Sequence, residues 1–418
     1  MSRWWQWLRE PVLPPVEPLS PRLDAALGFI LFLLGFFLPV SVAGVSLLLG
    51  ALVVITLLAA PAVWRSAPWR DPVVALGLLL LFYIALHTLL TSGFGAPSWK
   101  AINRYHELAI AAMLLALFRL MSRPQRFLQG LVAGALFYAG MHWLGLLSEP
   151  MARYLENRRI SAGFTLALVA FLLVALTRGG TKPLAARIAA AFLMATVFFA
   201  IDGRTGHVVM LLLIGCAAWL YSPRHWRWGA MIVLPLAVLG MALSSNPVQK
   251  RLSETVAGSV PAQGGDLSST GIRIELMRNG LNLARQYGLA GGGFAEYLRL
   301  SDQSAHELYG NDPARRAYLG RHWVRTENPH NEYLMQLVGG GAAALLLFLI
   351  WMVAPMLRRG RSRPVQTALI GIGLAFGFGC LFNSLLMDFV EGHFYVVLMT
   401  WLLARSGQPA APPQPATT

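Results

Sequence analysis

The chain has 418 residues, of which 56% are hydrophobic and only 13% are charged. Because so few polar side chains cannot cover the surface of a soluble globule of this length, the composition predicts a protein that lies in a lipid bilayer. The two cysteines, Cys216 and Cys380, both fall in apolar stretches, which excludes a disulfide framework and a cysteine-rich metal site.

Residues 1–24 are predicted to form an uncleaved arm at the cytoplasmic membrane surface. Trp4, Trp5 and Trp7 stand beside Arg3 and Arg9, and aromatic and basic side chains favour the membrane–water interface. No small-residue cleavage site follows a short apolar core, so the arm does not resemble a signal peptide.

Twelve apolar stretches follow, and they predict an all-α, polytopic integral membrane protein with about 12 transmembrane helices. Several stretches are shorter than the roughly 20 residues that a helix needs to cross a bilayer, so flanking residues must extend them. Nine lie within residues 25–243 and three within residues 333–404. They cover residues 25–40, 42–63, 72–90, 105–118, 127–147, 162–176, 184–201, 207–220, 228–243, 333–356, 365–386 and 394–404.

The orientation follows from the short loops, because Lys and Arg in such loops mark the cytoplasmic side. With the N-terminus inside, nearly all of the net charge of +15 lies in the cytoplasm, at positions such as Arg65, Arg119 and Arg358. The charge is therefore a topology signal and requires no nucleic-acid partner. Both termini are predicted to be cytoplasmic, and the Pro-, Ala- and Thr-rich residues 405–418 are predicted to be disordered.

One polar insertion, residues 244–332, interrupts the apolar pattern and is predicted to form a helical lid outside the cytoplasm. Ile272, Leu276, Leu283 and Tyr287 recur at helical spacing after capping residues at 266–270, so residues 271–286 are expected to form an amphipathic helix. Arg273 lies on the opposite side of that helix.

Glycines mark breaks in and after the lid. Residues 291–293 are all glycine and are expected to form a turn. Asp312 followed by Pro313 is expected to begin a second lid helix. A second glycine run, residues 339–341, is expected to permit close helix packing, and Asn383 to form an inter-helix hydrogen bond.

The end of the lid carries the strongest chemical signal. Asn328 is expected to cap the next helix and Pro329 to begin it, which puts His330 in its first turn. The positive end of the helix dipole would favour an anion there and lower the pKa of His330, so that the neutral imidazole could accept a proton. His207, after the short outer turn at 202–206, is a second candidate.

Basic residues in outer loops need a separate explanation, since the orientation rule disfavours them there. One interpretation is pairing with lipid headgroups or with Glu107, Glu149, Glu156 and Asp202. The alternative is a shared external site for an anionic ligand. The residues concerned are Lys100, Arg104, Arg153, Arg158, Arg159 and Arg204.

Several features occur in a fixed order along the chain. They are about 12 spans, one large outer insertion, the turn Gly203-Arg204-Thr205, Arg273 early in a lid helix, a glycine turn leading to Phe294, and Pro329-His330-Asn331 before Tyr333-Leu334. Together they resemble the O-antigen ligase and O-antigen polymerase superfamily, and most of all the O-antigen ligases of Gram-negative bacteria.

The resemblance implies a GT-C-like glycosyltransferase of lipopolysaccharide biosynthesis with a periplasmic active site, in the bacterial inner membrane. It implies transfer of a polysaccharide from undecaprenyl diphosphate to a hydroxyl of the lipid A core oligosaccharide, without a cofactor or a metal. The outer loops agree with this, since they show no Asp-X-Asp pair and no apparent His/carboxylate cluster.

Cleavage of a sugar–diphosphate bond requires a cationic clamp for the leaving group and a base for the acceptor hydroxyl. His330 is the candidate base, and Arg204 and Arg273 form the candidate clamp, because guanidinium groups match phosphate oxygens and stay charged. Direct attack would invert the anomeric centre. Candidate substrate-binding residues are Arg158, Arg153, Arg159, Lys100, Asn331, Glu332 and His207.

Other functions stay open at this point. An O-antigen polymerase, or a protein O-oligosaccharyltransferase, would use the same base and clamp, so the motifs do not separate either from a ligase. A secondary transporter usually places its site near the midplane and has repeated halves. Here the two halves differ and the polar features gather at the outer edge, which disfavours a transporter.

Overall fold

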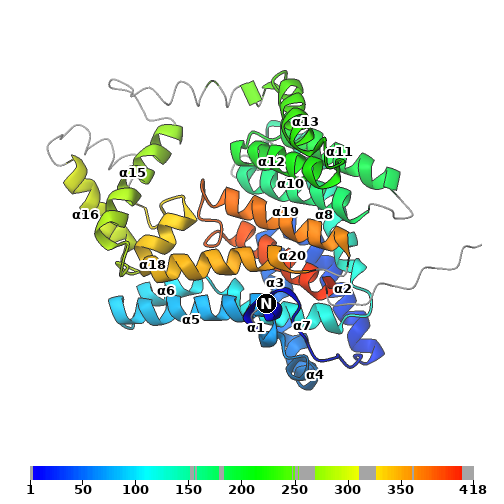
Figure 1. Cartoon of the computed structure of the whole chain (residues 1–418), viewed down its shortest axis with the longest axis horizontal. Coiled ribbons are helices and arrows are strands. Elements are labelled where there is room, and N and C mark those ends of the chain that lie inside the picture. Colours follow the sequence, from blue (N-terminus) through cyan, green and yellow to red (C-terminus); the bar gives the residue numbers. More distant parts are fainter. Residues whose placement is uncertain are drawn as a thin grey trace, which may run out of the picture.

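The computed structural model describes residues 3–150, 155, 158–177, 183–246, 248–249, 253, 269–309, 326–359 and 362–406. Every regular element within these residues is a helix (Figure 1). The helices are α1 (Arg3–Arg9), α2 (Pro21–Val40), α3 (Val42–Leu58), α4 (Ala60–Arg65), η1 (Pro68–Arg70), α5 (Pro72–Ser92), α6 (Ala96–Asn103), α7 (Glu107–Leu120), α8 (Gln125–Gly145), α10 (Arg159–Leu176), α11 (Pro183–Phe199), α12 (Arg204–Tyr221), α13 (Arg227–Ala242), α15 (Ser269–Tyr287), α16 (Tyr297–Tyr309), α18 (Glu332–Val353), η2 (Ala354–Leu357), α19 (Arg363–Gly379) and α20 (Phe389–Ser406).

Local sequence explains where several of these helices begin. Asp71 caps α5 by accepting a hydrogen bond from the Val73 amide at 3.0 Å, and proline follows the cap. Ser41 caps α3 by accepting from the Gly44 amide at 3.2 Å. Side chains of this kind satisfy amides that the first turn of a helix leaves without a partner, so the breaks between apolar stretches are encoded locally.

The structure identifies a membrane protein but does not confirm the expected number of spans. Each of the twelve predicted stretches overlaps a helix. Residues 380–386, predicted as the end of a span, instead lie in the loop between α19 and α20, and residues 42–63 hold two helices, α3 and α4. In the described part of the chain, six helices are long and apolar enough to cross a bilayer, or up to eight if two bent pairs each count as one span. Exposed apolar side chains such as Leu47, Leu57 and Leu90 lie on these helices, where lipid would cover them.

Two sets of polar contacts lie at opposite ends of the helices. At the predicted cytoplasmic end, buried Arg358 pairs with buried Asp71, and Arg119 donates to the Ser66 carbonyl at 2.7 Å. At the other end, Arg158 donates to the Val40 carbonyl at 2.8 Å. The candidate functional residues lie at this second end.

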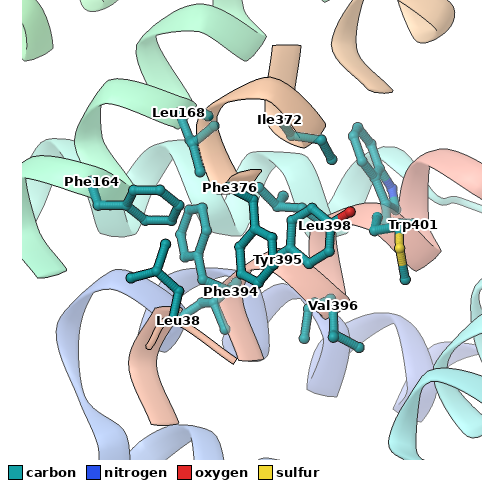
Figure 2. Packing of buried hydrophobic residues seen from close by; sticks show 14 of the residues in the cluster. Leu38, Phe164, Leu168, Ile372, Phe376, Phe394, Tyr395, Val396, Leu398 and Trp401 are labelled. Carbon is teal, nitrogen blue, oxygen red and sulfur yellow. The ribbon is translucent and has the colours of Figure 1, made fainter. Parts of the chain in front are cut away.

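The core lies where α2, α10, α19 and α20 meet. Figure 2 shows Phe164 of α10, Phe376 of α19 and Phe394 of α20 packed together, all fully buried. Phe376 also stacks on Tyr395, with ring centroids 3.9 Å apart. Burial of aromatic rings at this density fixes the ends of α19 and α20, and with them the loop that joins the two helices.

The part of the predicted lid that the structure describes consists of α15 and α16, which stand at one end of α18 and α5 (Figure 1). Helix α15 confirms the amphipathic helix expected at 271–286, and Leu276 and Leu283 are buried as its pattern predicts. Helix α16 was not predicted, and the helix expected at Asp312 lies outside the described residues.

The two glycine runs pack against each other and attach α15 to α18. The Gly292 amide donates to the Val338 carbonyl at 2.7 Å, and the Gly293 amide donates to the Gly339 carbonyl at 2.9 Å. Gly341 has φ of 74° and ψ of −172°, which kinks α18 at this contact. The run at 339–341 therefore permits close approach of a glycine loop, where close packing between helices was expected.

Gly341→Ala is expected to destabilise the protein. A Cβ there would lie 2.6 Å from the Ala290 carbonyl carbon and 2.6 Å from the Leu289 oxygen, both backbone atoms. The strained backbone alone costs roughly 1–3 kcal/mol for a residue with a side chain. Thermal unfolding in detergent should show a lower midpoint. Gly50→Ala, with no neighbouring atom within 4 Å of the new Cβ, is the control, and equal midpoints for both variants would contradict the prediction.

Candidate functional site

The segment before α18 differs from the sequence prediction. Helix α18 begins at Glu332 and its cap is Asn331, which accepts a hydrogen bond from the Leu334 amide at 3.0 Å. The prediction that Asn328 caps this helix was therefore wrong, and His330 precedes the helix instead of lying in its first turn. The Asn328 side chain accepts from the His330 amide at 2.8 Å, and His330 has φ of 52°.

That backbone conformation is informative. A left-handed φ is uncommon for a residue with a side chain, and such residues cluster at functional sites. Here the Asn328 turn and the Asn331 cap hold the strained residue between them. The hydrogen bonds of Asn328 and Asn331, on either side of His330 along the chain, thereby fix the backbone from which the imidazole projects.

The loop between α19 and α20 closes over the start of α18. The Glu332 amide donates to the Cys380 carbonyl at 2.9 Å, and the Leu386 amide donates to the Glu332 carboxylate at 3.0 Å. Asn331 also donates to the Leu381 carbonyl at 3.0 Å. Asn331 and Glu332 are predicted substrate-binding residues, and in the structure their side chains make these contacts within the protein.

A hydrogen-bonded chain runs from His330 into this loop. The Asn383 amide nitrogen donates to the Asp388 carboxylate at 2.6 Å, which leaves the Asn383 oxygen facing the Nδ1 atom of His330 at 2.8 Å. Because that oxygen is an acceptor, Nδ1 carries the proton and donates. The lone pair of the neutral ring is then on Nε2, which is the state that a general base requires.

The surroundings of His330 favour the neutral ring. Burial lowers the pKa of His330, the positive charge of Arg273 lowers it further, and the hydrogen bond with Asn383 opposes both effects. The predicted direction of the shift is confirmed, but its largest cause is burial, where the helix dipole was expected. The same observation shows that α15 brings Arg273 close enough to act on His330 electrostatically.

A second charged group lies beside this chain of hydrogen bonds. Glu327 pairs with Lys100 at 2.8 Å and also with Arg104. The hydrogen bond from Lys100 lowers the pKa of Glu327, and Arg104 adds to the effect. Burial raises the pKa of Asp388, and the charge of Arg104 opposes this. Arg104 therefore acts electrostatically on both Glu327 and Asp388.

The other predicted residues lie at the same end of the helices, in separate places. Arg204 begins α12 and Arg159 begins α10, and these starts touch, since a Cβ on Gly203 would lie 2.6 Å from the Arg159 carbonyl. Arg158 lines a cavity of about 150 Å³ between α2, α10 and α20. Arg153 lies outside the described residues.

His207 has a local role in the structure. Its Nε2 atom lies 3.0 Å from the carbonyls of Val197 and Ile201, and its ring stacks on Phe198. These contacts join the start of α12 to the end of α11. The side chain is buried, so the hydrogen bonds to backbone account for its polar atoms on that side.

The sequence showed no His/carboxylate cluster in the outer loops, and the structure brings one together at the starts of two helices. His106 and Glu107, at the start of α7, lie with His393 of α20 so that one ligand atom from each is within 4.8 Å of the others. Sequence reasoning also missed Glu327 and Asp388. The available signal was an acidic residue between two apolar stretches, which Asp388 provides.

Comparison with known proteins is consistent with this site. No curated protein matches the chain. A family model described as O-antigen ligase matches residues 189–349, a segment that contains Arg204, Arg273 and His330. Members of such a family are membrane enzymes that act on polysaccharides and lipid-linked substrates. The match over residues 189–349 supports an assignment to the O-antigen ligase family, among membrane glycosyltransferases of the ligase or polymerase type.

Proposed function

We propose that this chain is an O-antigen ligase that acts at the periplasmic face of the inner membrane. Its donor is a polysaccharide linked to undecaprenyl diphosphate, and its acceptor is a hydroxyl of the lipid A core oligosaccharide. The observation that carries the proposal is the state of His330, whose Nδ1 proton is held by Asn383 while Arg273 acts on the ring.

The reaction follows from these groups. The acceptor oxygen attacks the anomeric carbon of the donor sugar and its proton passes to His330 Nε2, as in general base catalysis. The bond between the anomeric carbon and the diphosphate oxygen breaks with both electrons going to the diphosphate. Arg273 and Arg204 stabilise the negative charge that develops there. A single displacement of this kind inverts the anomeric centre.

Substrate binding is assigned to the basic residues around the site. Arg158 lines the cavity between α2, α10 and α20, and Arg159 lies next to the start of α12. We assign them to binding of the carrier diphosphate, since one guanidinium group can donate two hydrogen bonds to two oxygens of a phosphate. Lys100 lies at the same end of the helices. We assign it to phosphates of the acceptor core, which would replace Glu327 as its partner.

Reconstitution tests the function. The purified protein is placed in liposomes with a polyprenyl diphosphate-linked glycan, and lipid A core or a second carrier-linked unit is added separately. Glycan on lipid A core supports the ligase. Longer chains on the carrier alone would replace it with a polymerase, and movement of the glycan across the membrane without bond cleavage would replace it with a transporter.

Asn383→Ala is expected to reduce transfer by up to about 100-fold, because the imidazole loses the partner that sets its position and tautomer. The hydrogen bond with Asn383 raises the pKa of His330, so its removal should also move the acid limb of the pH–rate profile to lower pH. The rate constant should fall with little change in KM. Asn282→Ala, which removes a hydrogen bond to Ser304 in α16, is the control. An unchanged pH profile in Asn383→Ala would remove Asn383 as a positioning residue.

A further inference from the structure

We propose that His106, Glu107 and His393 form a binding site for one zinc ion. His106 and Glu107 lie at the start of α7 and His393 lies in the first turns of α20, and one ligand atom from each is within 4.8 Å of the others. Two imidazoles and one carboxylate are a ligand set that zinc accepts in proteins. None of these residues is assigned a step in the proposed transfer reaction, although His393 also lines the cavity that contains Arg158.

Backbone hydrogen bonds set the tautomers of both imidazoles. His106 Nδ1 lies 2.6 Å from the Asn103 carbonyl, and His393 Nδ1 lies 2.8 Å from the Phe389 carbonyl. Each Nδ1 therefore carries a proton and donates it to backbone, which leaves the lone pair on Nε2. A ligand histidine in metal sites usually donates its other ring nitrogen in this way.

Two of the atoms that would bind the metal have no hydrogen-bond partner in the described part of the chain. They are His393 Nε2 and Glu107 Oε1, and both are buried. The other Glu107 oxygen, Oε2, lies 3.6 Å from His106 Nδ1. His393 and Glu107 are each only 2% exposed. A buried polar atom without a partner is costly, and here two such atoms belong to one cluster, so a bound cation would satisfy both.

Charge favours a cation at the same place. Glu332 is fully buried and lies close enough to act electrostatically on Glu107. Arg104, the nearest basic residue in the sequence, pairs with Glu327. Two buried carboxylates are thus close together, and a divalent ion beside Glu107 would offset their repulsion.

The geometry is close to what zinc requires. Ligands bonded at about 2.1 Å in a tetrahedral zinc site lie roughly 3.4 Å apart. The ligand atoms, which lie within 4.8 Å of one another, therefore need to close by at most about 1.4 Å. His106 is partly exposed, so an ion and a water as the fourth ligand can enter from that side. The zinc would join the start of α7 to α20, next to Arg104 and Asp388.

Metal analysis tests the proposal. The full chain is produced without a polyhistidine tag in zinc-supplemented medium, purified in detergent, and measured by inductively coupled plasma mass spectrometry. About one zinc per chain is expected for the parent, and less than about 0.2 for Glu107→Gln and for His393→Gln, because each loses a ligand. His225→Gln, which changes an exposed histidine elsewhere, should retain the zinc.

A second measurement keeps the test decisive where a variant folds poorly. The parent protein is stripped with EDTA, and its thermal unfolding is followed as zinc is added back. A zinc-dependent rise of the midpoint is expected in the parent and in His225→Gln, and none in Glu107→Gln. Zinc at or below about 0.2 per chain in the parent, or equal zinc in the parent and Glu107→Gln, overturns the proposal.

Discussion

Replacing His330 with asparagine is expected to lower the rate of glycan transfer by about 10²- to 10⁴-fold, the contribution of a positioned general base. Asparagine suits this test because it tolerates the left-handed backbone that His330 adopts at φ of 52°. It can also keep a hydrogen bond with Asn383. The change therefore removes the proton acceptor while it leaves the local fold in place.

The measurement is a single-turnover assay with the lipid-linked donor and lipid A core in liposomes. Binding of the donor to His330→Asn should stay close to that of the parent, since the base contributes to the transition state more than to the ground state. His306→Asn, which changes an exposed residue of α16, is the matched control and should transfer at the parent rate. A folded His330→Asn protein that transfers as fast as its parent would eliminate the proposed base.

The features that could be predicted from the sequence are those that local patterns encode. Each apolar stretch overlaps a helix, and the spacing of Leu276 and Leu283 predicted the buried face of α15. Arg273 was selected from the family resemblance, as an arginine early in a lid helix, and the structure brings it within electrostatic range of His330. Periodicity is a property of neighbouring residues, which is why a single sequence sufficed for the helices.

The start of α18 shows where local reasoning fails. Asn328 with Pro329 and Asn331 with Glu332 both satisfy the rules for a helix start. The second wins because Asn331 accepts from Leu334 and because the adjoining loop at 380–386 receives bonds from Asn331 and Glu332. Those loop contacts join residues about 50 positions apart, so no local signal could rank the two starts.

The partners of His330 were unpredictable for the same reason. Asn383 was expected to make a hydrogen bond between helices, and it instead links His330 to Asp388. The zinc ligands likewise combine the adjacent pair His106 and Glu107 with a histidine far along the chain. Side chains from distant segments meet only after the helices pack, and periodicity carries no information about that pairing.

Arg273→Gln is expected to lower transfer by about 10²- to 10³-fold, because loss of one preorganised donor to developing charge costs about 2.7–4 kcal/mol. The donor diphosphate is the group affected, so the loss should be largest with diphosphate carriers. Arg278→Gln on the same helix is the matched control, since Arg278 is exposed and pairs with Glu275 at 3.2 Å. It should transfer at close to the parent rate.

The pH dependence separates a role in leaving-group stabilisation from a general loss of structure. Transfer requires neutral His330, so the rate falls as the pH drops through the pKa of that residue. The charge of Arg273 lowers the pKa of His330. Removal of the charge should raise the pKa, and the acid limb of the profile should move to higher pH, opposite to the shift expected for Asn383→Ala. Arg273→Lys keeps the charge but loses the paired donors, so its limb should stay near that of the parent while its rate falls. An Arg273→Gln profile with its limb unmoved would mean that Arg273 does not act on His330 in the working enzyme.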